Sequence, residues 1–138
     1  MTLRKIARLG QPVLLNRATP VDDPGRPEIQ TLVDDMLETM ADAEGIGLAA
    51  PQVYVGLRVI VATDLRDRSE AASAPVRVLL NPELEPLGEE TEMAYEGCLS
   101  IPELRGLVPR ARRVGYCGLD RDGRPVEGEA EGLFARVL

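Results

Sequence analysis

The 138-residue sequence contains no histidine. Within these residues, this absence excludes a Ser-His-Asp triad, a Cys-His protease pair and imidazole ligands for a metal, and it removes the commonest general base. Tryptophan is absent as well, and aromatic residues make up only 3% of the sequence. Aliphatic side chains must therefore form the core, and any catalysis by these residues alone must use other groups.

Cysteine, long apolar runs and positive charge are also scarce. Cys98 and Cys117 are too few for a disulfide scaffold, so we expect two free thiols. No apolar run approaches the roughly 18 residues that span a bilayer, and residues 1–5 do not resemble the start of a signal peptide. Sixteen basic and 23 acidic residues give a net charge of −7, which disfavours nucleic acid and anionic membranes as partners. We expect a cytoplasmic protein with one compact domain, residues 1–138.

The pattern of apolar residues predicts an α+β fold. Apolar residues recur at helical spacing from about 27 to 44, and the acidic residues between them are expected to form a solvated face: Asp34, Asp35, Glu38 and Asp42. Short strands are expected at 57–63, 76–80 and 110–119, with a surface loop at 66–75. Asp122-Gly123 indicates a hairpin that leads into 125–130, and apolar spacing predicts a helix that begins at Leu133.

Two short segments could carry chemistry. Gly45-Ile46-Gly47-Leu48-Ala49-Ala50-Pro51-Gln52 has two glycines that let the backbone approach another chain closely, followed by an amide donor at Gln52. Taken alone, it is more typical of a helix C-cap followed by a turn. In Glu96-Gly97-Cys98-Leu99-Ser100, a cysteine at a strand end could present a thiolate, although most free cysteines are inert small hydrophobes. Cys117 is expected to be inert, and the alternating Arg110, Arg112 and Arg113 to form an exposed face.

Together, in this order and spacing, the two segments closely resemble the first two signature motifs of the peptide deformylases. The resemblance continues through Ile101-Pro102, Val108-Pro109-Arg110 and Glu129-Ala130-Glu131-Gly132, and so covers nearly the whole sequence. It implies an α+β fold with antiparallel sheets, an N-terminal helix and the start of a C-terminal metal-binding helix. It also implies the activity: metal-dependent hydrolysis of the formyl group from the N-terminal formyl-methionine of new polypeptides, with nascent chains at the ribosome as partners.

The resemblance further implies roles for residues of this sequence. Cys98 would be a metal ligand; the metal is ferrous iron in many members, and zinc, nickel or cobalt can replace it. Gln52 and the Leu99 N–H would stabilise the oxyanion. The substrate site would be lined by six other residues, with Ile46 in the pocket for the methionine side chain and Arg105 near the peptide entrance: Gly45, Ile46, Gly47, Glu96, Gly97 and Arg105.

The third family motif, H-E-x-x-H, is absent from this sequence. On a helix it supplies two metal ligands at i and i+4 with a general-base glutamate between them. In the family it follows a segment like Leu133–Leu138. The resemblance therefore implies a C-terminally truncated peptide deformylase with two ligands missing, and these 138 residues alone should be inactive or nearly so. The alternative is a short, non-catalytic homologue that acts as a binding or structural module.

Overall fold

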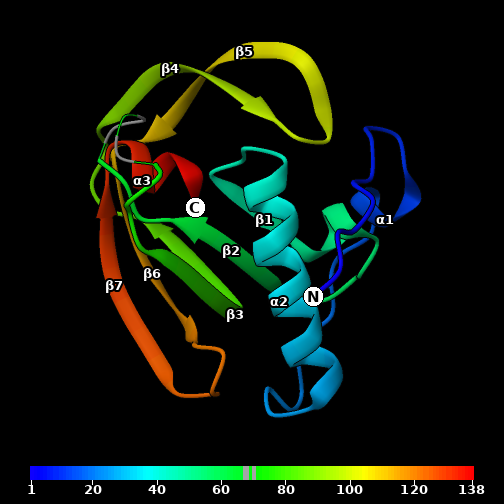
Figure 1. Cartoon of the computed structure of the whole chain (residues 1–138). Helices are drawn as coiled ribbons and strands as arrows, with labels where there is room; N and C mark the ends of the chain where they lie inside the picture. The colour runs from blue at the N-terminus through cyan, green and yellow to red at the C-terminus, as the bar shows by residue number, and fades with distance from the viewer. Residues whose placement is uncertain (67–68, 70) are drawn as a thin grey trace.

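The computed structural model describes residues 1–66, 69 and 71–138. Figure 1 shows their helices and strands, which follow in chain order: α1 (Pro12–Leu15), α2 (Pro27–Asp42), β1 (Gly47–Ala49), the 3-10 helix η1 (Ala50–Val53), β2 (Val59–Thr63), β3 (Val76–Pro86), β4 (Thr91–Cys98), β5 (Ile101–Ala111), β6 (Arg113–Leu119), β7 (Pro125–Glu131) and α3 (Leu133–Val137). Antiparallel sheets with separate helices confirm the expected α+β class.

Helix α2 confirms the helix expected at 27–44, although it ends two residues early. Pro27 occupies its first turn, where a missing N–H costs nothing, and Glu44 beyond its end has a positive φ of 53°. The apolar face is buried as expected. The expectation of a solvated acidic face is wrong for Asp35, which is only 4% exposed and forms an ion pair with Arg4. A buried carboxylate needs such a partner, and the partner here is more than thirty residues away in the sequence.

A five-stranded antiparallel sheet in the order β1-β2-β3-β6-β7 forms the centre of the fold. The strands expected at 57–63 and 76–80 correspond to β2 and β3, but β3 continues to Pro86 through an irregularity between Leu80 and Glu83. The strand expected at 110–119 corresponds to β6, but the predicted start is three residues too early: β6 starts at Arg113, and Arg110 belongs to β5. The hairpin at Asp122-Gly123 is confirmed: it joins β6 to β7, and Gly123 has a φ of 79°.

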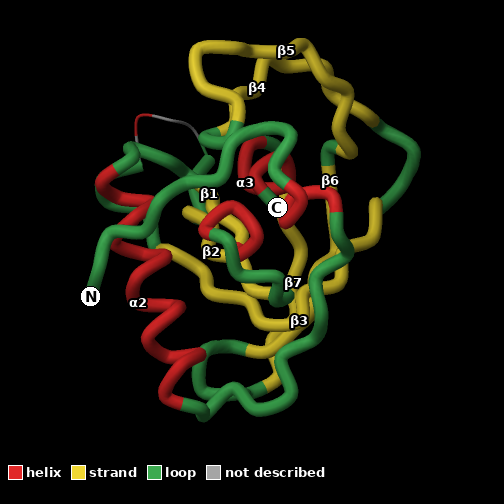
Figure 2. Tube along the Cα trace, turned by 90° about the vertical axis from the view of Figure 1, so that its right-hand side faces the viewer, coloured by secondary structure: helices red, strands yellow, loops and turns green. Residues whose placement is uncertain are grey.

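Strands β4 and β5 form a separate two-stranded sheet that extends over one end of the larger sheet (Figures 1 and 2). The sequence did not predict β5, because prolines and a glycine interrupt it and apolar alternation is weak. The register of the β4–β5 pairing shifts between Gly97 and Cys98 of β4. Gly97 pairs with Arg105, whereas Cys98 pairs with Ile101. The three residues between these partners, 102–104, consequently protrude beside Cys98.

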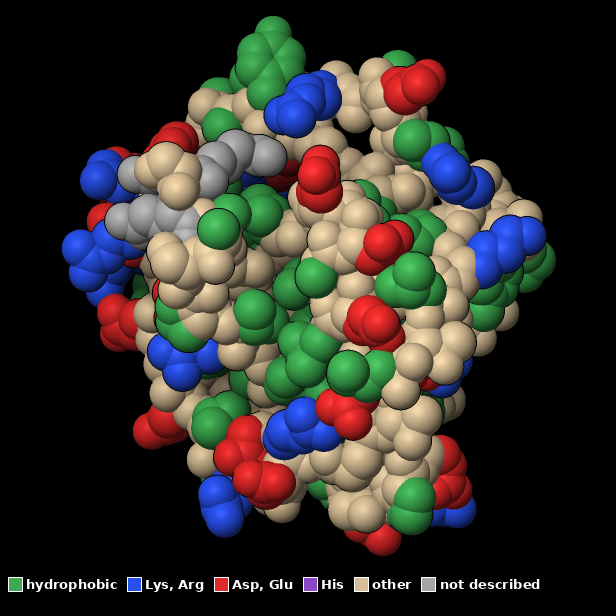
Figure 3. All heavy atoms as spheres, viewed as in Figure 1, with side chains coloured by type: hydrophobic (Ala, Val, Ile, Leu, Met, Phe, Trp, Pro, Cys, Tyr) green, Lys and Arg blue, Asp and Glu red, His purple; other side chains and the backbone are tan. Residues whose placement is uncertain are grey.

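Helices α2 and α3 pack on opposite faces of β2, which alternates its side chains between them. Val59 and Val61 belong to the larger apolar cluster with α2, whereas Ala62 packs in the smaller cluster with Phe134 and Ala135 of α3. The expected helix beginning at Leu133 is thereby confirmed. Figure 3 shows hydrophobic side chains gathered near the middle of one face, with charged side chains mostly around them.

The expected loop at 66–75 is only partly covered by the structure, since residues 67, 68 and 70 lie outside the described part. The others in that range are exposed or half-buried. Within the described ranges, no helix has the length and apolar composition needed to cross a bilayer.

Candidate active site

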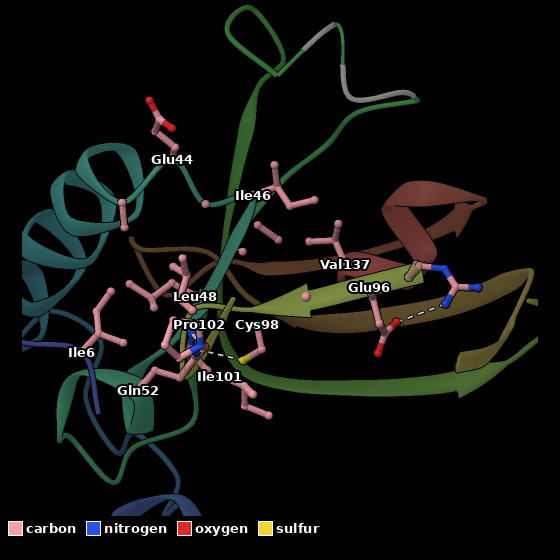
Figure 4. A pocket seen from close by; sticks show the side chains of 18 of the residues that line it. Ile6, Glu44, Ile46, Leu48, Gln52, Glu96, Cys98, Ile101, Pro102 and Val137 are labelled. Atoms are coloured by element: carbon pink, nitrogen blue, oxygen red, sulfur yellow. Dashed lines mark hydrogen bonds and ion pairs between the residues drawn. The ribbon is translucent and has the colours of Figure 1, made fainter. Parts of the chain in front are cut away.

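The two motifs singled out in the sequence meet at one pocket of about 990 Å³. Strand β1 and η1 supply one wall, the β4–β5 hairpin supplies another, and Val137 and Leu138 at the end of the chain close a third side (Figure 4). The lining includes all nine residues that the sequence analysis selected: Gly45, Ile46, Gly47, Gln52, Glu96, Gly97, Cys98, Leu99 and Arg105.

The two glycines of the first motif permit two different close contacts. A Cβ built on Gly45 would lie 2.8 Å from Leu99 Cδ1, so the absence of a side chain there admits the second motif. A Cβ on Gly47 would lie 3.0 Å from Val137 Cγ1, so that glycine admits the end of α3. The close approach expected from the sequence is therefore confirmed. Leu99 approaches Gly45, and Val137 approaches Gly47.

The Gln52 side-chain amide is oriented by the backbone of Ala49, three residues earlier in the same motif. The Ala49 N–H donates to Gln52 Oε1 over 2.9 Å, which turns the NH₂ end toward the second motif. Gln52 Nε2 lies 3.6 Å from Cys98 Sγ and 3.1 Å from Ser100 Oγ (Figure 4). Because its oxygen accepts from Ala49, the amide directs its donor hydrogens toward Cys98 and Ser100 at the pocket.

Glu96 lies between two arginines from different elements. Arg110 of β5 donates to both carboxylate oxygens, and Arg136 of α3 donates to Glu96 Oε2 over 3.1 Å. The Arg110 hydrogen bonds, opposed by burial and helped by Arg136, hold the pKa of Glu96 below its ordinary value. Arg136 is almost buried and also donates to the carbonyls of Val108 and Glu92. This contact network fastens the β4–β5 hairpin to α3.

Sequence reasoning missed the two arginines for different reasons. Arg110 was assigned to an exposed face and is indeed half exposed, but it also binds Glu96. Even the register of β4 and β5 does not reveal its partner, because Arg110 lies opposite Glu92, four residues along β4 from Glu96. Arg136 stands in an apolar segment. Nothing in the sequence there indicates that it binds Glu96, forty residues earlier.

The donors in the pocket do not by themselves fit a complete metal centre. The described residues contain no group of three or more Cys, Asp or Glu that could hold an ion, and the sequence has no histidine. Cys98 is exposed to the pocket, whereas the nearby Glu96 carboxylate is committed to its arginines. Cys117 is a free thiol as expected, and it is exposed at a different groove from Cys98.

Comparison with known proteins identifies the family. The model of the polypeptide deformylase family matches residues 3–138. The chain belongs to the polypeptide deformylase family. It is 48% identical to peptide deformylase 1 of Bordetella pertussis, over 99% of this chain and 78% of that protein. It is 55% identical to the peptide deformylase of Chromohalobacter salexigens, over 91% of this chain and 70% of that protein.

Solved structures of the family share the fold. A crystal structure of a class I type b peptide deformylase from Acinetobacter baumannii with Met-Ala-Ser bound has a TM-score of 0.89 at 34% identity, over 99% of this chain and 88% of that one. The Thermotoga maritima enzyme has a TM-score of 0.89 at 35% identity, over 99% and 87%. Polypeptide deformylases are metal-dependent hydrolases, so the pocket formed by the two motifs is the candidate active site of this chain.

Proposed function

We propose that this pocket binds the N-formyl-methionyl end of new polypeptides and hydrolyses the formyl amide. The observation that carries the proposal is the Gln52 amide, which the Ala49 N–H turns toward Cys98. In the reaction, water adds to the formyl carbon, the C–N bond breaks, and formate and a free amine leave. Negative charge develops on the formyl oxygen, and a preorganised donor lowers the energy of that state. Gln52 Nε2 and the Leu99 N–H are the donors that we assign to it.

The substrate assignments rest on the family motifs, and the position of these residues around the pocket supports them. Gly45 and Gly47 line the pocket and let Leu99 and Val137 approach closely, and we assign the small formyl group to this narrowed part of the pocket. Ile46 would contact the methionine side chain, and Glu96 and Gly97 would shape the opposite wall. Arg105 would lie at the peptide entrance, on the strand that pairs with Gly97. The Met-Ala-Ser ligand of the Acinetobacter enzyme supports a peptide ligand for a site of this fold.

The metal assignment is limited to one ligand. We assign Cys98 as that ligand and ferrous iron as the metal, with zinc, nickel or cobalt as replacements. On this proposal, two further ligands and the general base come from an H-E-x-x-H helix outside these residues, and these residues alone are inactive or nearly so. Nascent chains at the ribosome in the cytoplasm are the proposed partners, and the net charge of −7 gives no support for direct nucleic-acid binding.

The test joins these 138 residues to the remaining C-terminal residues of the Bordetella relative, including any H-E-x-x-H motif found there. We expect the extended chain to release formate from formyl-Met-Ala-Ser and the 138 residues alone to release almost none. Gln52→Ala should lower kcat about 10²–10³-fold with the metal content unchanged, since one oxyanion donor is lost. Gln11→Ala, an exposed glutamine before α1, is the matched control.

A second arm tests the metal ligand in the same extended chain. Cys98→Ala should abolish stoichiometric metal in the purified protein, whereas Cys117→Ala, the other exposed thiol, should leave it intact. If Cys117 proves to be the essential thiol, the assignment of the second motif is wrong. An extended chain that binds formyl peptides without hydrolysing them would instead favour the non-catalytic binding module.

A further inference from the structure

The N-terminal segment touches both motifs through its backbone. The Ala7 N–H donates to the Gln52 carbonyl over 2.7 Å, and the Leu9 N–H donates to the Ser100 carbonyl over 2.9 Å. Ala7 is fully buried in this position. Gln52 and Ser100 are also the residues whose side chains meet, since Gln52 Nε2 donates to Ser100 Oγ over 3.1 Å. Backbone and side-chain bonds thus close a ring through two motifs that lie nearly fifty residues apart.

The same segment is anchored to α2 at its other end. The Thr2 N–H donates to Asp35 Oδ1 over 2.7 Å, and the Arg4 N–H donates to Thr39 Oγ1 over 2.9 Å. The Arg4 guanidinium also forms a 2.8 Å ion pair with Asp35. Asp35 and Thr39 are only 4% and 3% exposed, so these two polar side chains lie on the buried side of an amphipathic helix.

Two buried polar side chains on this face need an explanation, since burying a polar group without a partner costs free energy. Their partners among the described residues all come from the N-terminal segment. Burial opposes ionisation of Asp35, but the Thr2 N–H and Arg4 outweigh it and hold its pKa below the ordinary value. Asp35 and Thr39 therefore hold residues 2–9, a segment that contains no helix or strand.

We propose that residues 2–9 form a strap, tied to α2 by Asp35 and Thr39, that positions Gln52 and the Leu99–Ser100 backbone for the oxyanion. This rests on the proposed function of that site. Asp35 and Thr39 are positioning residues: neither lines the pocket, and each acts through the strap. A displacement of about 1 Å at a reacting centre can cost on the order of 10²-fold in rate. Ile6 and Arg8 of the strap line the pocket, but the strap holds Gln52 and Ser100 through their carbonyls, so loosening it should slow turnover more than it weakens substrate binding.

The experiment compares neighbouring carboxylates on one helix. Asp35→Asn removes the charge that holds Arg4, whereas the control Asp34→Asn removes the same charge from a pair with Arg121 in the β6–β7 turn. In the extended chain, Asp35→Asn should lower kcat about 10-fold or more with KM changed less than about 2-fold, and Asp34→Asn should change neither. In the 138-residue chain, amide exchange at Ala7 and Leu9 should accelerate about 10-fold or more with Asp35→Asn only.

Thr39→Val is the second strap variant, because it keeps the shape of a buried side chain while removing the acceptor of the Arg4 N–H. It should reproduce the loss of kcat even if Asp35→Asn folds poorly. Strap variants that match Asp34→Asn in kcat, or that raise KM alone, would overturn the proposal, as would unchanged exchange at Ala7 and Leu9. If the unmodified extended chain is inactive, the proposed function fails, and the exchange measurement still decides whether Asp35 and Thr39 hold the strap.

Discussion

At the scale of single residues, the glycines of the first motif determine how closely three elements approach. Gly45 faces Leu99 of the second motif, and Gly47 faces Val137 of α3. Leu99 precedes Ser100, whose carbonyl accepts from the strap at Leu9. The Leu99 N–H is also one of the two proposed oxyanion donors. A side chain at position 45 would therefore disturb the site from a position that contributes no functional group of its own.

We expect Gly45→Ala to lower the free energy of unfolding by about 1 kcal/mol, the low end of the usual cost of overpacking, because only the end of the Leu99 side chain must move. Gly56→Ala is the control, because a Cβ there meets nothing within 4 Å and the backbone needs no positive φ. Urea unfolding of the variants measures the difference. Equal stability of Gly45→Ala and Gly56→Ala would contradict the tight contact between the motifs.

The sequence predicted the residues around the pocket better than it predicted the residues that hold them. Gln52 and Cys98 stand in multi-residue motifs, and resemblance selects them without any knowledge of the fold. Asp35 and Arg136 lack such a signal, because an acidic residue on a helix and a basic residue in an apolar segment are each most often solvated. Their importance comes from partners that only the tertiary structure brings close.

At the scale of elements, the β4–β5 hairpin depends on α3 for its attachment. Strand β5 escaped prediction because its apolar alternation is weak, and its pairing with β4 and the Arg136 contacts compensate for that weakness. Glu96 is the centre of the attachment, since it binds Arg110 within the hairpin and Arg136 on the helix. Its ionisation should therefore contribute to stability.

The sign of this contribution follows from the lowered pKa of Glu96. A carboxylate with a depressed folded pKa stabilises the fold above about pH 4.3, the unfolded value, and the stabilisation is lost as the pH falls through the folded pKa. Near pH 7, Glu96→Gln should be less stable than the unaltered chain by about 1–3 kcal/mol. The difference should vanish in acid, where both side chains are neutral.

Denaturant unfolding at a series of pH values measures this difference, and contributions from Asp35 cancel because both chains contain it. Glu129→Gln is the matched control, since Glu129 pairs with Arg113 at an exposed position. Exposed pairs contribute about 0–1 kcal/mol, so its difference should stay small throughout. A Glu96→Gln difference that persists unchanged at low pH would show that packing, rather than charge, explains the effect.

At the scale of the whole molecule, the two apolar clusters differ in size and in what completes them. Among the residues that the structure describes, the larger cluster lies between α2 and the sheet and contains twelve buried residues. The smaller contains five, and two of these, Phe134 and Ala135, come from the five-residue helix α3. Helices this short are marginal in water by themselves, so α3 depends on its packing. Residues that lengthen α3 would stabilise it and cover more of the pocket beside Val137.

We therefore expect the 138-residue chain to be marginally stable and to bind a hydrophobic dye or self-associate. The chain extended with the C-terminal residues of the Bordetella relative should melt higher and bind less dye. Two or three large core contacts at about 2–5 kcal/mol each would form a large part of a typical domain stability of about 5–15 kcal/mol. Thermal unfolding with light scattering and dye fluorescence compares the two chains. If the 138 residues unfold cooperatively as a monomer, bind no dye and melt as high as the extended chain, α3 needs no continuation, and the self-sufficient binding module becomes the better account.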